Sequence, residues 1–184
     1  LRRTFRDLGE VRVRTLYGRI TFSLECEDIE EIHRRMSGVF GVANYACVRE
    51  VPQELEAMRQ AAWQALQEAH GSTFAVRCRR PDKSFPMRST ALEREIGGYL
   101  HDQCRLSGRE MKVDLSHPQI TVRLELVNKV ALVSGERFPG PGGLPVGTAG
   151  KIVGLLSSGF DSPVAAWQLM KRGAEIVLCH FHSY

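Results

Sequence analysis

A strand–helix–strand pattern over residues 151–179 constrains the fold of this chain more than any other feature. Residues 151–156 form a short apolar run, residues 163–172 have a helical pattern that opens with a proline, and residues 174–179 form a second apolar run. Gly173 stands where a helix C-cap glycine belongs. The pattern predicts a βαβ unit with a right-handed crossover, and therefore a parallel sheet of the α/β class.

The turn between the first strand and the helix consists of small and polar residues, namely Ser157, Ser158, Gly159, Phe160, Asp161 and Ser162. A turn of this kind directs several backbone N–H groups and the positive end of a helix toward one point, which suits an anion. We therefore expect a phosphate-binding loop for a nucleotide. The residues at the two strand ends would then flank the adenine, namely Leu155, Leu156, His180 and Phe181. His180 equally fits a structural role at its strand end.

The loop differs from a Walker P-loop because Asp161 stands where that motif needs a lysine. An acidic residue beside phosphates implies a metal ion. An ordinary strand-to-helix turn, with Ser162 as N-cap and Pro163 as first helical residue, explains the same residues and stays open. The loop resembles the SGGxDS motif of the PP-loop ATP pyrophosphatases, which cleave ATP between the α and β phosphates. Ser158 replaces a glycine of that motif, at a cost of about 1 kcal/mol if the position needs a positive φ.

Composition indicates a globular protein of one large or several small domains. The chain has 184 residues, of which 43% are hydrophobic and 25% charged. It contains neither an apolar run of membrane-spanning length nor a signal-peptide core. We therefore expect a cytoplasmic protein that does not contact a membrane.

The cysteine count is odd, and the spacing contains neither CxxC nor a His/Cys pattern suited to zinc. We expect reduced, mostly buried thiols. The five residues are Cys26, Cys47, Cys78, Cys104 and Cys179.

A basic cluster lies within residues 71–90, where five cations face one acidic residue, Asp82. It is a candidate surface for a phosphate backbone, with an aromatic residue available to stack on a base or to pack internally. A solvated loop is the alternative interpretation of such a charge run. The candidate RNA-binding residues are Arg77, Arg79, Arg80, Lys83, Phe85 and Arg88.

The N-terminal residues alternate strand and helix signals. Residues 11–17 and 20–24 predict a hairpin, residues 28–36 a helix, and residues 39–48 a strand. With one strand upstream, the order becomes βαββαβ, a small ferredoxin-like sheet.

A second unit begins near Pro52 with a helix to about Ala69, followed by a strand over residues 73–78. Thr90 and Glu93 predict a capping box for a further helix, and residues 120–126 and 130–133 predict strands joined by a turn at Asn128. Residues 135–150 hold six glycines and three prolines, so we expect neither helix nor sheet there, but a linker ordered by packing. Because the chain stops directly after a second strand, we expect a piece of a longer protein.

Three motifs in this order resemble one family. They are residues 74–85, the pair of segments Val113-Asp114-Leu115 and His117-Pro118, and the Gly142–Thr148 segment GGLPVGT before the loop. The combination resembles the tRNA 4-thiouridine synthetases, or tRNA sulfurtransferases (ThiI). The resemblance implies an α+β N-terminal ferredoxin-like domain (1–50) and THUMP RNA-binding domain (51–135), a linker (136–150), and the first βαβ unit of an α/β PP-loop domain (151–184).

The resemblance also implies a chemistry. ATP activates uridine 8 of tRNA by adenylation, and a cysteine persulfide then delivers sulfur and expels AMP. Asp161 would act with Mg²⁺ as the catalytic residue, and the other loop residues would donate hydrogen bonds to the phosphates. The persulfide cysteine is expected beyond residue 184.

The implied partners are tRNA and a cysteine desulfurase, and a homodimer is compatible with the family. Sulfur supply for the thiamine thiazole is a second role that the resemblance raises. Two other functions stay open at this point: a tRNA-binding THUMP module without catalysis, and a PP-loop ATP pyrophosphatase acting on another substrate.

Overall fold

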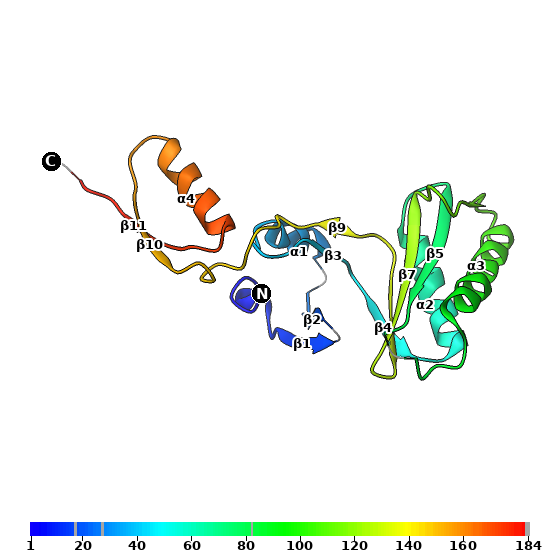
Figure 1. Cartoon of the computed structure of the whole chain (residues 1–184). Helices are drawn as coiled ribbons and strands as arrows, with labels where there is room; N and C mark the ends of the chain where they lie inside the picture. The colour runs from blue at the N-terminus through cyan, green and yellow to red at the C-terminus, as the bar shows by residue number, and fades with distance from the viewer. Residues whose placement is uncertain (17, 27, 82, 183–184) are drawn as a thin grey trace. The chain divides into compact units, whose positions relative to one another are not determined.

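The structure is a computed structural model that describes residues 1–16, 18–26, 28–81 and 83–182. The chain divides into two compact units (Figure 1). One comprises residues 1–13, 22–45 and 138–184, and the other residues 14–21 and 46–137. Both combine helices with strands, so the expected mixed fold class is confirmed.

The second unit is built on a five-stranded sheet with the order β4-β8-β7-β5-β6. Its strands are β4 (Arg49–Pro52), β5 (Thr73–Arg79), β6 (Lys112–Val113), β7 (Ile120–Val127) and β8 (Val130–Ser134). Two helices pack on one face of the sheet (Figure 1), α2 (Leu55–Glu68) and α3 (Ser89–Leu106). The expected order of helix, strand, helix and further strands is confirmed. The strand β4 was not foreseen, because the sequence-based prediction assigned Pro52 to a helix start.

Alternation along β7 explains how this sheet buries one face. Ile120, Val122 and Leu124 belong to the core cluster, whereas the residues between them are only half-buried. The cluster continues through Leu66 of α2 and Ile96 of α3, both fully buried. Burial of each such side chain stabilises the fold by about 1.5–3 kcal/mol. Because the apolar residues alternate with a period of two, they all lie on one face of the sheet, and the helices pack on that face.

In this unit the structure confirms the hairpin turn predicted at Asn128 but not the helix capping box predicted at Thr90 and Glu93. Asn128 and Lys129 have φ values of 46° and 64°, as a two-residue hairpin turn requires. The capping box of Thr90 and Glu93 is wrong, because α3 begins at Ser89 and has no side-chain cap. Glu93 Oε1 instead accepts the N–H of Cys78 at 2.8 Å, which satisfies a donor near the end of β5.

The N-terminal region contains the short 3₁₀ helix η1 (Arg6–Leu8), strands β1 (Arg12–Leu16) and β2 (Arg19–Ser23), and helix α1 (Ile29–Met36). β1 and β2 pair as the expected hairpin, although Tyr17 and Glu27 lie outside the described residues. The predicted strand over residues 39–48 is wrong: only β3 (Asn44–Tyr45) forms. Residues before it bend, with Gly41 at a φ of 89° and its N–H donating to Gly142.

The glycine-rich linker, residues 135–150, is ordered by contacts, as expected. Contrary to expectation, it also contains a short strand. Phe138–Pro139 forms β9, which pairs antiparallel with β3. The linker backbone then contacts the C-terminal end of α4 (Asp161–Lys171). The Leu144 N–H donates to the Lys171 carbonyl at 2.9 Å, and the Gly147 N–H donates to the Gly173 carbonyl at 2.8 Å. A Cβ on Gly143 would lie 2.2 Å from the Lys171 oxygen, so the close approach requires glycine.

The βαβ unit is confirmed. Strand β10 (Lys151–Leu155) pairs parallel with β11 (Glu175–Cys179), and α4 connects them (Figure 1). The register runs from Lys151 opposite Glu175 to Leu155 opposite Cys179. Gly173 has a φ of 94° and its N–H donates to Met170, which is how a C-cap glycine ends a helix.

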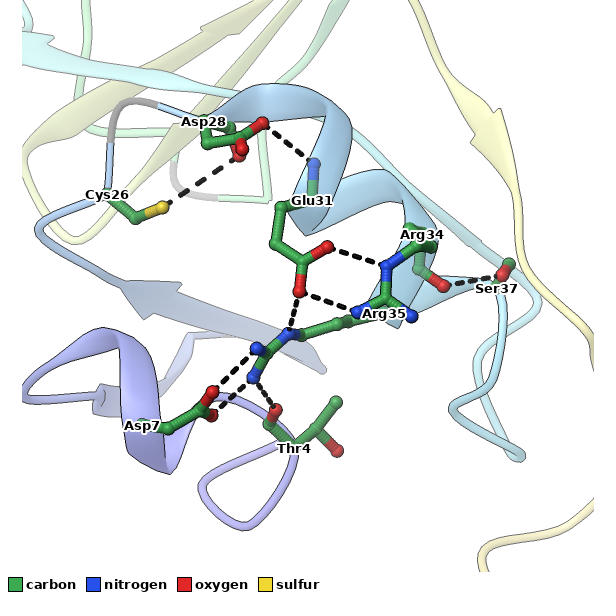
Figure 2. A network of polar contacts seen from close by, with 8 residues as sticks. All are labelled: Thr4, Asp7, Cys26, Asp28, Glu31, Arg34, Arg35 and Ser37. Atoms are coloured by element: carbon green, nitrogen blue, oxygen red, sulfur yellow. Dashed lines mark hydrogen bonds and ion pairs between the residues drawn. The ribbon is translucent and has the colours of Figure 1, made fainter.

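A polar network holds the N-terminal turn to α1 (Figure 2). The Arg35 guanidinium donates to Asp7, to Glu31 Oε1 at 2.6 Å and to the Thr4 carbonyl at 2.7 Å. Glu31 also accepts from Arg34, at 2.6 and 2.7 Å. Hydrogen bonds from Arg35 to Asp7, and from Arg34 and Arg35 to Glu31, lower the pKa of each carboxyl to about 2.

Replacing glycine by alanine should have opposite effects at two positions. Gly98 lies inside α3, and a Cβ there would meet nothing within 4 Å, so Gly98→Ala should raise stability by about 1 kcal/mol. Gly143→Ala should lower it by about 1–2 kcal/mol or more, because φ is 78° and the Cβ would clash with Lys171. Urea unfolding measures both. Equal effects of the two changes would contradict this account of the linker.

Acid should release the N-terminal turn from α1. The carboxyl pKa values of Asp7 and Glu31 lie below their ordinary values of 3.8 and 4.5, so the stabilisation is complete above about pH 4.5. It is lost as the pH falls toward about 2. Carboxyl ¹³C NMR titration should show both low midpoints. Arg35→Met should return Asp7 toward 3.8, whereas the control Arg34→Met should leave it low. A wild-type Asp7 midpoint near 3.8 would refute the network.

Candidate functional site

The loop between β10 and α4 is closed by two serine hydroxyls. The Ser157 N–H donates to Ser162 Oγ at 3.0 Å, and the two hydroxyl oxygens lie 3.0 Å apart. The Gly159 N–H donates to Ser157 Oγ at 3.3 Å. α4 begins at Asp161 with Phe160 as N-cap, so Ser162 is a residue of the first turn and not the N-cap of the ordinary-turn alternative. Its hydroxyl ties the helix start back to the strand end.

Ser158 occupies its position without backbone strain. The residues with positive φ include neither Ser158 nor Gly159. The cost expected for a serine in a left-handed conformation therefore does not arise. Both residues are exposed, as is Asp161 in the first turn of α4.

The two strand ends are held together by backbone and imidazole contacts. The Leu156 N–H donates to the Cys179 carbonyl at 2.8 Å, which extends the β10–β11 ladder by one residue. His180 Nδ1 lies 2.8 Å from the Leu156 carbonyl oxygen. Because a carbonyl only accepts, the proton of this hydrogen bond is on Nδ1. The structural role foreseen for His180 is thus present, and its ring is fixed beside the loop.

Two of the other three predicted adenine-flanking residues are open to solvent: Leu155 is 66% exposed and Phe181 79%, whereas Leu156 is half-buried. The loop residue Phe160 is 90% exposed. Large apolar side chains at this exposure, clustered at the ends of parallel strands, offer contact area to a flat ring. The structure places all ten predicted nucleotide-site residues on the loop, in the first turn of α4 or directly at the two strand ends.

The chemistry of the loop suits Mg²⁺ only in combination with phosphates. The described residues contain no group of three or more His, Cys, Asp or Glu side chains that could hold a metal. Mg²⁺ commonly takes one or two carboxylates and completes its shell with substrate phosphates and water. The exposed Asp161 carboxylate fits that mode.

Three of the five cysteines have a shifted thiol pKa, and in each of them the pKa is raised, which makes the thiol less reactive. Burial raises the pKa of Cys78 to about 11 and also raises the pKa values of Cys47 and Cys104. All five thiols are free, but only Cys78 and Cys104 are buried, so the expectation of mostly buried thiols is wrong. A raised pKa lowers the thiolate population that attacks sulfur.

The predicted RNA-binding residues separate into two groups. Arg77 and Arg79 are exposed on β5, and Lys83 and Arg88 are exposed beside the following loop. Arg80 instead donates to the carbonyls of Lys83 and Phe85, and Phe85 packs against the core cluster. Arg80 and Phe85 therefore brace the loop. Asp82 lies outside the described residues.

A groove of about 580 Å³ beside α3 was not foreseen from the sequence. Gly97 and Gly98 leave the helix backbone bare along it, and Val113 and Leu115 line it from the segment containing β6. Two glycines inside a helix are the signal that indicates such a close approach.

The fold and the loop together define a class of protein: an α+β domain built on a five-stranded sheet, with the opening strand–loop–helix of an α/β domain in the same chain. The THUMP domain family profile matches residues 51–136, and the profile described as thiamine biosynthesis protein (ThiI) matches residues 147–184.

Relatives give the same result over the whole chain. Proteins named "Probable tRNA sulfurtransferase" are 40% identical over 186 residues in Moorella thermoacetica and 37% over 184 residues in Thermus thermophilus, each covering all of this chain. The chain covers 46% and 44% of those proteins, about half their length. A crystal structure of a 4-thiouridine synthetase–RNA complex with bound ATP superposes with a TM-score of 0.86 and 28% identity, over 99% of this chain and 47% of that one.

Over its whole length the chain is therefore similar to part of the tRNA sulfurtransferases (ThiI), as the sequence motifs indicated. Within the described residues, no helix is both long enough and apolar enough to cross a membrane.

Substituting Ser158 by glycine should not stabilise the folded protein. Because Ser158 has an ordinary φ, Ser158→Gly gains nothing in the folded state and raises the entropy of the unfolded chain. Stability should fall by about 0.4–1 kcal/mol, measured by urea unfolding. A stabilised Ser158→Gly variant would show that the loop is strained after all.

Proposed function

We propose that the whole protein carrying this chain is an ATP-dependent tRNA sulfurtransferase that makes 4-thiouridine at position 8 of tRNA. One observation carries the proposal: a strand–loop–helix with an anion-binding shape follows a THUMP domain in the same chain. The named relatives and the ATP-containing synthetase complex support it. The chain would supply the RNA-docking half and the opening of the ATP site.

The reaction has two steps. The uracil O4 is a poor leaving group until it is adenylated, so ATP transfers AMP to it and releases pyrophosphate. In the second step the terminal sulfur of a persulfide attacks C4 and AMP leaves. A second thiol then attacks the remaining S–S bond, which frees the thiolated uridine and leaves a protein disulfide that an external thiol must reduce. A cysteine desulfurase would charge the persulfide, and we assign that cysteine to none of the five present here.

The loop residues would bind and orient the triphosphate. Ser162 Oγ accepts the Ser157 N–H and Ser157 Oγ accepts the Gly159 N–H, so either hydroxyl can turn its proton to a phosphate oxygen while its oxygen keeps that N–H bonded. The backbone N–H groups at the start of α4 add partial positive charge at the same point. Leu155 and Phe181 would cover the adenine, with His180 held in place by the Leu156 carbonyl.

Asp161 would hold Mg²⁺ against the phosphates. When bound, the ion neutralises the charge that develops on the departing pyrophosphate. The carboxylate is exposed at the first helical residue, where it can reach such an ion without rearranging the loop.

The exposed cations near β5 would dock the acceptor end of tRNA. Arg77 and Arg79 project from the strand, and Lys83 and Arg88 follow it. Contacts of this kind bind a folded RNA by charge and shape. A homodimer and sulfur supply for the thiamine thiazole are further parts of this proposal, taken from the family.

ATP–pyrophosphate exchange by the whole protein tests the function. Exchange should be stimulated by an unmodified tRNA transcript and not by small carboxylic acids. Asp161→Asn should reduce it by about 10²-fold or more, because the metal then loses its carboxylate. Asp102→Asn, an equal charge change on an exposed residue of α3, is the control and should leave exchange unchanged.

Two results would overturn the proposal. Exchange stimulated by a small acid in place of tRNA would indicate a different PP-loop substrate. Tight tRNA binding with no exchange under any condition would indicate an RNA-binding module without catalysis.

A further inference from the structure

The register between β5 and β7 places arginines side by side on the face of the sheet that α2 and α3 do not cover. Phe74, Val76 and Cys78 of β5 belong to the helix-facing core. The residues between them face the other way, and the parallel pairing sets Arg77 opposite Arg123 and Arg79 opposite Glu125. The Arg77 guanidinium donates to the Leu115 carbonyl, so a neutral acceptor and not a carboxylate binds it.

Glu125 is the carboxylate at the centre of this cluster, and it is already bound. Arg19 donates to it through Nε at 3.0 Å and Nη2 at 2.7 Å. Arg79 approaches it to 3.7 Å. The hydrogen bond with Arg19 is the main cause of the lowered pKa of Glu125, and the nearby positive charges of Arg79 and Arg137 lower it further.

Arg123 has no acidic partner. Its Nη1 donates only to backbone carbonyls, those of Thr121 at 3.2 Å and Gly135 at 3.4 Å. Across the described ranges 1–16, 18–26, 28–81 and 83–182, no carboxylate lies at ion-pair distance from Arg123, Arg77 or Arg137. Burial lowers the pKa of Arg123, and so does the neighbouring charge of Arg137. The cluster thus holds more positive charge than the protein neutralises.

We propose that the arginines on this face of the THUMP sheet bind RNA backbone phosphates, with Arg123 and Arg137 acting together with Arg77 and Arg79, and with Glu125 limiting the affinity. A phosphate beside Arg123 and Arg137 would offset the repulsion between these two charges and supply Arg123 with its missing counter-charge. This inference rests on the proposed function, and it adds two arginines and one opposing carboxylate to the RNA surface.

Salt titration of tRNA binding to the whole protein tests the surface. Arg123→Gln and Arg137→Gln should each reduce the magnitude of the slope of log K against log salt by about 0.7–0.9. Arg105→Gln removes one exposed charge from α3, on the helix-covered side, and should leave the slope unchanged. Thermal unfolding of each variant shows whether the fold is intact, and the exposed Arg137 carries the test if Arg123→Gln unfolds.

Glu125→Gln distinguishes a phosphate surface from a structural cluster. It removes the opposing charge while keeping a hydrogen-bond acceptor for Arg19, so binding should tighten and the slope should steepen. Weaker or unchanged binding would contradict the inference, as would Arg123→Gln and Arg137→Gln variants that behave like Arg105→Gln. If the wild-type protein does not bind tRNA, the proposed function itself fails.

Discussion

The pairing of β10 with β11 is the constraint on which the proposed nucleotide site depends. Parallel register brings Leu155 opposite Cys179, and the Leu156–Cys179 hydrogen bond carries the ladder to the first loop residue. The chain must then reverse into α4 within a few residues, which aims the helix start at the strand ends. The Ser157–Ser162 contacts hold that reversal closed. The glycine-rich linker supports the unit from the other end of α4 through Gly143 and Gly147.

In the THUMP domain, the register of the sheet decides which residues face the core and which face the opposite side. One period of two along β5 and β7 sends apolar residues to the helices and arginines to the opposite face. The same pairing that stabilises the core therefore concentrates positive charge on a surface. Glu125 compensates part of it although it also pairs with Arg19, and the remainder is available to an anion. The packed core and the proposed RNA-binding surface thus have one structural origin.

The sequence predicted those features that depend on local chemistry. Gly173 as a helix C-cap, Asn128 and Lys129 as a hairpin turn, and the βαβ unit are all confirmed, because each follows from backbone conformation or hydrophobic period. It could not predict roles that depend on distant partners. Glu93 binds the Cys78 N–H and not its own helix start, and Arg80 braces a loop. The Arg77–Arg123 pair joins strands over forty residues apart, so only the fold brings it together.

The central claim is that the loop between Leu156 and Pro163 cradles the phosphates of ATP. The most direct measurement is a crystal structure of the whole protein with Mg²⁺ and a non-hydrolysable ATP analogue. The account predicts phosphate oxygens within hydrogen-bond distance of backbone N–H groups in this loop, with the adenine against the β10 and β11 ends. A nucleotide bound elsewhere, with this loop unchanged and empty at saturating analogue, would contradict it.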